Sequence, residues 1–260
     1  MPERKERVRE KIKDYDLKHS AAHVLASAMK HLYPECQLAI GPPLEDSFYY
    51  DFGNVQVREE DIPKIEAEMR RIIKENHPFE FKEVPRKEAE QMLKKEPFKR
   101  EILKDIAGKI TFYKHGTFMD LCEGPHVKST GDIKAVKLTK VAGAYWKGDS
   151  KNPQLTRVYG VVFKSEKELK AWEQQQEEAA KRDHVKLGRQ LELYMLDPIS
   201  PGSAFFFPRG AVIYNELVNF LREEYKKRGY QEVITPILYN SDLWKQSGHW
   251  EHFRENMFVL

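Results

Sequence analysis

Apolar residues follow two different spacings in the first part of the chain. Across residues 61–76 they recur three and four positions apart, which predicts an amphipathic helix. Residues 18–33 predict a second helix, which Pro34 ends because proline cannot continue a helix. The segment FEFKEV at 79–84 alternates with a period of two and predicts a strand.

The other elements of this part do not repeat in a regular order. Two strands around a Gly-Pro-Pro turn are predicted within 38–52, two short helices within about 86–107, and strands at 109–121, 133–145 and 156–163. Because strands and helices do not alternate, we predict an α+β fold with a mixed or antiparallel sheet. A doubly wound parallel sheet is less consistent with this order.

The pattern changes at Ser165, where SEKE predicts a capping box with Glu168 at the third helical position. The helix expected from there to about residue 193 is highly polar, and such helices often bridge two domains. Beyond it, AFFF predicts a strand, residues 209–228 an amphipathic helix, and YQEVIT another strand.

These patterns divide the chain into four parts. We predict a charged N-terminal tail at 1–17, a first domain at 18–164, a linker helix at 165–193 and a second domain at 194–260. The second domain stops at the apolar segment ENMFVL without a closing turn. We therefore expect the chain to end inside a fold.

Composition narrows the class of protein. The 260 residues include 44 Lys and Arg against 41 Asp and Glu, a net charge of +3, and 12% are aromatic. This excludes collagen-like and disordered chains, and two cysteines cannot form a disulfide framework. No apolar run reaches the ~20 residues that cross a bilayer, and no signal peptide is evident, so we expect a cytoplasmic protein without membrane contact. The small charge permits a nucleic-acid partner without requiring one.

Two histidines stand out on the predicted helix at 18–33. His19 and His23 lie four positions apart, about 40° from each other around the helix. The apolar stripe lies nearly opposite, and the small Ala22 and Ala26 share the histidine face. We therefore expect this face to line a cleft.

A second pair follows in DLCEGPHVKS, where Cys122 and His126 lie four apart on a loop with Gly124 and Pro125. Two histidines, a cysteine and a third histidine are ligands that zinc prefers. The same side chains can provide a base, a proton shuttle and a polar clamp for hydrolysis. The residues alone leave both interpretations open.

Longer motifs carry a resemblance to a known family. HSAAHVLA, AIGPPLEDSFYYDF, DLCEGPHV and VAGAYWKGDSKNPQLTRVYGVVF follow one another as in threonyl-tRNA synthetases. They resemble the second N-terminal domain of that family, which hydrolyses mischarged seryl-tRNA. EEAAKRDHVKLGRQLELY resembles its linker, KRGYQEVITP its class II motif 1 with Pro236, and LWKQSGHWEHFRENMF continues the match.

The resemblance implies an editing fragment of a threonine–tRNA ligase. The family's small N-terminal domain, class II motifs 2 and 3, catalytic zinc ligands and anticodon-binding domain have no counterpart in this sequence. We therefore expect no threonine activation by this chain alone, with ATP and the catalytic zinc belonging to a longer parent chain. The parent family is homodimeric, and the implied partner is the acceptor end of tRNA(Thr) carrying serine.

The resemblance also assigns roles to residues. It places His19, His23, Cys122 and His126 in the hydrolytic site, with Lys99 positioning the water. It makes Asp120 the acid that holds the ammonium group of the substrate, and Tyr50 a residue near the substrate. It implies no metal; if zinc is present, the three histidines and Cys122 are the expected ligands.

Residues after the site are candidates for contact with tRNA. Several lysines on or near the predicted strands suit phosphate contacts, although a solvated sheet face explains them nearly as well: Lys128, Lys134, Lys137, Lys140 and Lys147. Tyr145 or Trp146 suits stacking on an unpaired base, and a buried aromatic is the alternative.

Two further functions compete with editing in a ligase chain. One is a stand-alone zinc-dependent aminoacyl-tRNA deacylase of the alanyl type, and the other is a non-catalytic RNA-binding module with a structural zinc. The motif 1 segment at 227–236 counts against the deacylase, because such proteins carry no start of a class II catalytic domain.

Overall fold

The computed structural model describes residues 11–259, which form two compact units on either side of a boundary between Glu178 and Ala179. The predicted charged tail at 1–17 lies largely outside the described residues. Its last residues already belong to helix α2 (Tyr15–Leu32), so this helix begins before the predicted position 18.

A four-stranded antiparallel sheet forms the larger layer of the first unit. Its strand order is β1-β2-β7-β6, and β2 pairs with β7 so that Tyr50 lies opposite Val158. The strand bounds are β1 (Gln37–Leu38), β2 (Phe48–Gly53), β6 (Ala135–Tyr145) and β7 (Gln154–Phe163). Antiparallel pairing throughout confirms the predicted α+β class for this unit.

A three-stranded antiparallel sheet in the order β3-β4-β5 completes the strands of this unit. Its strands are β3 (Glu80–Glu83), β4 (Thr111–His115) and β5 (Phe118–Leu121). The single strand predicted at 109–121 is wrong, because Gly116 at φ +54° allows a tight turn there. The turn folds β5 back on β4, with His115 opposite Phe118.

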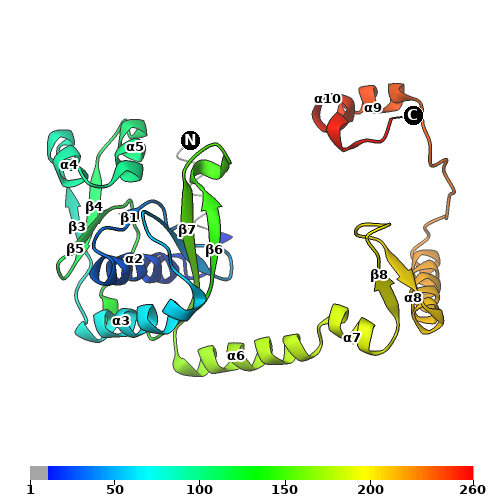
Figure 1. Cartoon of the computed structure of the whole chain (residues 1–260), viewed down its shortest axis with the longest axis horizontal. Coiled ribbons are helices and arrows are strands. Elements are labelled where there is room, and N and C mark those ends of the chain that lie inside the picture. The colour runs from blue at the N-terminus through cyan, green and yellow to red at the C-terminus, as the bar shows by residue number, and fades with distance from the viewer. Residues whose placement is uncertain (1–10, 260) are drawn as a thin grey trace. The chain divides into compact units, whose positions relative to one another are not determined.

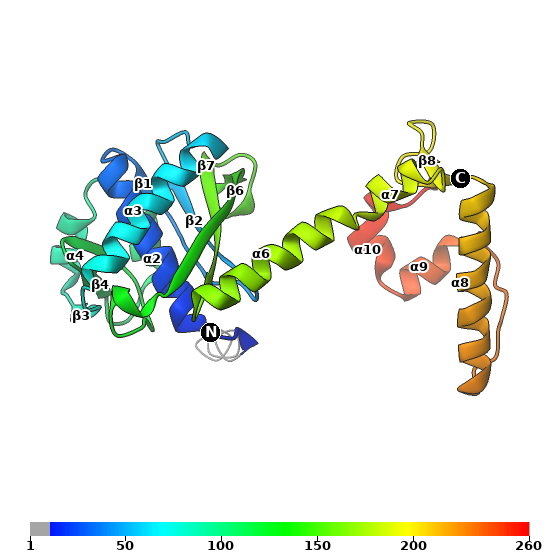
Figure 2. The same cartoon turned by 90° about the horizontal axis from the view of Figure 1, so that it is seen from below.

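Helices cover both sheets. Figure 1 and Figure 2 show α2 beside α3 (Ile62–Glu75) on one face of the four-stranded sheet, and apolar residues of α2, α3, β2 and β7 form the main core. The predicted stripe of α3 is confirmed, since Ile65, Met69 and Ile72 are buried. The short helices α4 (Arg86–Met92) and α5 (Pro97–Asp105) pack their apolar residues against the three-stranded sheet.

The polar helix after Ser165 is divided in two. The predicted cap is confirmed, because the Ser165 Oγ accepts a hydrogen bond from the Glu168 N–H at 3.2 Å. Helix α6 (Glu166–Lys181) ends early, and α7 (His184–Gln190) begins at a new N-cap, where Asp183 accepts from the Lys186 N–H at 2.8 Å. A side-chain acceptor at this position favours a helix start.

The second unit contains one hairpin and three further helices. The elements are β8 (Tyr194–Leu196), β9 (Ala204–Phe206), α8 (Pro208–Lys227), α9 (Ser241–Gln246) and α10 (His249–Phe253). The strand predicted for YQEVIT is wrong, because this segment pairs with no other strand in residues 11–259 and Ile234 is 96% exposed. The apolar ENMFVL is likewise unpaired over its described residues and begins in a short 3₁₀ turn. A strand needs a neighbour that accepts and donates its backbone hydrogen bonds.

Among the helices of residues 11–259, none combines the length and apolar composition needed to cross a bilayer.

Candidate functional site

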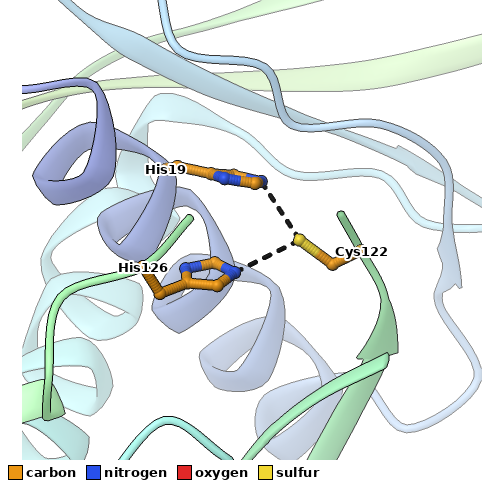
Figure 3. A group of neighbouring side chains, drawn as sticks. All are labelled: His19, Cys122 and His126. Carbon is orange, nitrogen blue, oxygen red and sulfur yellow. Dashed lines mark hydrogen bonds between the residues drawn. The ribbon is translucent and has the colours of Figure 1, made fainter. Parts of the chain in front are cut away.

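Helix α2 and the loop after β5 bring three polar side chains together, as Figure 3 shows. The Cys122 Sγ lies 3.3 Å from the Nε2 of His19 and 3.2 Å from the Nε2 of His126. The two imidazole rings stack with centroids 4.4 Å apart. Residues more than a hundred positions apart in the chain therefore form one group.

The loop is held to β4 and to the helix. Cys122 continues the strand pairing, since its N–H donates to the Thr111 carbonyl and its own carbonyl accepts from the Thr111 hydroxyl. Gly124 adopts φ +66°, and a Cβ there would lie 2.5 Å from the Tyr113 hydroxyl. A side chain at this position would be strained by the backbone conformation and would have to displace the Tyr113 ring.

One hydrogen bond fixes the protonation pattern of His19. Its Nδ1 lies 3.2 Å from the Pro125 carbonyl oxygen, which can only accept. Nδ1 therefore carries the proton in the neutral ring, and the Nε2 lone pair points at the Cys122 sulfur.

Desolvation controls the charge of the group. Burial, followed by the nearby His19, lowers the pKa of His126 to about 2. Burial also raises the pKa of the Cys122 thiol to about 12. At neutral pH the site thus presents a neutral imidazole and a protonated thiol, so Cys122 is no ready nucleophile.

A second, buried group lies beside the first. The Asp120 Oδ2 accepts from the Lys99 ammonium and from the Tyr50 hydroxyl, each at 2.7 Å. All three residues are at least 95% buried. Lys99 also donates to the Leu121 carbonyl at 3.3 Å, and burial together with Asp120 raises the pKa of Tyr50 well above its usual range, which keeps it a donor.

Strand β5 connects the two groups. Alternation along an extended chain places Asp120 and Cys122 on one side of it. The structure thus brings six of the seven predicted residues into two adjoining groups: His19, Tyr50, Lys99, Asp120, Cys122 and His126.

His23 is placed differently from the others. Its ring is 2% exposed and packs edge-on against Phe79, Phe118, His115 and His126. Neither ring nitrogen has a hydrogen-bond partner among the described residues, and burial lowers its pKa well below the usual range.

The expected cleft along this helix face is wrong at His23. Ala22 and Ala26 are almost fully buried, so they leave no open space above the histidine. The helix is covered by the sheet, by α3 and by the hairpin of β4 and β5, which a helical projection does not reveal.

Two aromatic residues were missed by the sequence analysis. Phe79 stacks on His126 with ring centroids 4.7 Å apart and planes 2° from parallel. Tyr113 meets the same imidazole edge-on at 4.5 Å. Their only sequence signal is the strand pattern, which cannot identify a ring partner.

Three of the lysines that are candidates for contact with tRNA already have polar partners within the chain. Lys137 pairs with Glu173, Lys147 with Glu101, and Lys134 donates to the Gly131 carbonyl. Trp146 is 4% exposed, which confirms the buried-aromatic alternative for that residue, whereas Tyr145 is 45% exposed.

The donor set has the chemistry of a metal site. One ligand atom each from His19, Cys122 and His126 lies within 4.8 Å of the others. Tetrahedral zinc holds sulfur and nitrogen ligands about 3.5 Å apart, close to the separations found here. His23 lies outside this group, so the predicted four-residue zinc set is reduced to three among the described residues.

Known proteins are similar to this chain over most of its length, well beyond the residues of the site. Residues 110–159 match the family described as threonyl and alanyl tRNA synthetase second additional domain. The chain is 50% identical to the threonine–tRNA ligases of Thermotoga neapolitana and Thermotoga maritima over 249 residues, 94% of its length. It is 51% identical to that of Clostridium botulinum over 247 residues. The chain spans about 39% of the length of these relatives.

Proposed function

Because this chain is a relative of threonyl-tRNA synthetases along 94% of its residues, we propose that its first unit hydrolyses the serine ester of mischarged tRNA(Thr). Serine lacks one methyl group of threonine, and a pocket made for the larger side chain rejects it by only ~1–3 kcal/mol. A second site that removes serine after transfer supplies the missing discrimination. The observation that carries this proposal is the meeting of His19, Cys122 and His126 beside the Lys99–Asp120 pair.

The buried group suits the amino end of the substrate and the attacking water. Asp120 receives both hydrogen bonds on Oδ2, and no described residue donates to its Oδ1, which leaves that oxygen for the substrate ammonium. Lys99 uses two of its three N–H groups on Asp120 and Leu121. Its third N–H is assigned to the hydrolytic water.

The histidine group suits the proton transfer. The oxygen of water attacks the ester carbonyl carbon, and the water proton passes to an unprotonated imidazole Nε2, for which His19 is well placed. The ester C–O bond then breaks, and the departing ribose oxygen takes that proton. Tyr50 holds Asp120, and His23 supports the ring of His126 from the core.

A zinc-dependent deacylase is the second candidate, supported by the fit of the three donors to a metal. His19, Cys122 and His126 would hold zinc, which would polarise the ester carbonyl as a Lewis acid. Zinc binding would release the proton of the Cys122 thiol, so in this candidate the affinity for zinc would rise with pH.

We expect hydrolysis of seryl-tRNA(Thr) to survive complete removal of metal. The chain is treated with EDTA, its zinc content is measured by mass spectrometry, and the rate is compared before and after treatment. An unchanged rate at less than one tenth of a zinc per chain is expected. Stoichiometric zinc, with activity lost on chelation and restored by zinc, would establish the deacylase alternative.

The second unit corresponds, in this proposal, to the beginning of a catalytic domain that is complete in the longer relatives. Residues 194–260, with the motif 1 segment ending at Pro236, are assigned to the start of a class II catalytic domain. Threonine activation, ATP, a catalytic zinc and homodimer formation are assigned to the full-length relatives. The acceptor end of tRNA(Thr) is the proposed partner, and the cytoplasm the proposed location.

The direct test uses the purified chain on two esters. Hydrolysis of seryl-tRNA(Thr) is measured beside threonyl-tRNA(Thr) under the same conditions. The serine ester is expected to react at least ~100-fold faster, because a smaller pocket excludes the extra methyl of threonine more strongly than a larger pocket excludes serine. Binding of tRNA without any hydrolysis would support the non-catalytic RNA-binding module.

A further inference from the structure

Ser20, which directly follows His19 on α2, has three hydrogen-bond partners. Its side chain is fully buried, and its hydroxyl donates to the Asp16 carbonyl at 2.7 Å. The same oxygen lies 3.0 Å from the Val127 N–H and 3.1 Å from the Nδ1 of His126. A single atom of the helix therefore contacts two consecutive residues of the loop that follows β5.

The proton count of a hydroxyl fixes the direction of these bonds. A serine hydroxyl has one proton and two lone pairs. The proton goes to the Asp16 carbonyl, and one lone pair accepts from the Val127 N–H, which can only donate. The second lone pair must then accept from His126, so Nδ1 of that imidazole carries the proton.

We propose that Ser20 is a positioning residue that holds His126 in its Nδ1–H tautomer and turns the Nε2 lone pair towards Cys122. The hydrogen bond to Val127 fixes the loop at the same point, so ring orientation and tautomer are set together. The catalytic consequence rests on the proposed editing function; the tautomer itself does not.

With both histidines in these tautomers, the group has one proton fewer than its two nitrogen–sulfur contacts require. His19 bonds the Pro125 carbonyl through Nδ1, so its Nε2 also faces the sulfur as an acceptor. Two acceptor nitrogens then share the one S–H proton of Cys122. We assign proton transfer from the attacking water to the nitrogen that does not receive this proton; the transfer breaks a water O–H bond and forms an N–H bond.

The same helix offers a matched control. Ser27 lies two turns further along α2, is 1% exposed, and its hydroxyl has no hydrogen-bond partner among the described residues. Ser20→Ala and Ser27→Ala thus remove the same atom from equally buried places on one helix. Only the first removes a partner of His126.

Nitrogen NMR of the imidazoles tests the proposal. The full chain is labelled with ¹⁵N-histidine and kept in EDTA at neutral pH, and the signals of His126 are assigned by their loss in His126→Ala. We expect wild type and Ser27→Ala to show a protonated Nδ1 and an unprotonated Nε2. Ser20→Ala should move both shifts towards the average of the two tautomers, and hydrolysis of seryl-tRNA(Thr) should fall at least tenfold.

Two results would overturn the assignment: a protonated Nε2 in the wild-type His126, or the same tautomer in Ser20→Ala as in Ser27→Ala. If Ser20→Ala does not fold, the wild-type spectrum alone decides between the tautomers. Absence of hydrolysis by the wild type, combined with the expected tautomer, would contradict the proposed function and leave the role of Ser20 standing.

Discussion

Replacing Lys99 with Met is expected to slow hydrolysis of seryl-tRNA(Thr) at least ~100-fold and to lower the free energy of unfolding by about 3–5 kcal/mol. The Lys99 ammonium lies 2.7 Å from Asp120, and both side chains are at least 94% buried. Without the lysine, the carboxylate of Asp120 stays in the interior, and among residues 11–259 its remaining hydrogen-bond donor is the Tyr50 hydroxyl. An uncompensated buried charge is among the most costly changes a core can receive.

Two further variants separate the effect on stability from the effect on rate. Lys147→Met removes an exposed ion pair with Glu101 and should change stability little. The double variant Lys99→Met/Asp120→Asn removes the buried charge as well, and should recover part of the lost stability without recovering hydrolysis. Urea unfolding and single-turnover rates provide both quantities. Full activity of the double variant would contradict the assignment of water and ammonium to these residues.

Replacing either His19 or His126 with Ala should lower the hydrolysis rate by about 10²–10⁴-fold, the usual contribution of a positioned proton acceptor. Each imidazole presents its Nε2 to the same sulfur, at 3.3 Å and 3.2 Å. Because the two rings belong to one group, the double variant should lose little more than either single variant.

His31→Ala provides the control on the same helix. This histidine lies three turns beyond His19, is partly exposed and pairs with Glu68 at 2.8 Å, outside the site. Its loss should leave the rate within twofold of wild type. Unchanged rates in both His19→Ala and His126→Ala would remove the site assignment.

Local patterns predicted those elements whose packing follows from their own sequence. The helix predicted at 61–76 is found as α3 (Ile62–Glu75), because its stripe of buried residues repeats at the helical period. The N-cap at Ser165 was likewise predictable from the sequence, because capping depends on a residue only three positions away. The strand predicted for YQEVIT is not formed, because a strand depends on a partner elsewhere in the fold, which the local sequence does not specify.

The site divides in the same way. Resemblance selected its residues, and the spacing of His19 and His23 placed both on one helix face that was expected to line a cleft. The structure gives His19 a hydrogen bond to the loop and buries His23 in a cage of rings. That difference depends on how β5 and the segment at Phe79 pack against the helix, which the sequence of the helix alone does not predict.

The proposed editing function requires that the first unit prefer a serine ester to a threonine ester. Purified chain is mixed with seryl-tRNA(Thr) or threonyl-tRNA(Thr), and the loss of each ester is followed against the uncatalysed rate. We expect rapid loss of the serine ester and near-background loss of the threonine ester, as this preference requires. Equal rates for the two esters, or no loss of either above background, would contradict it.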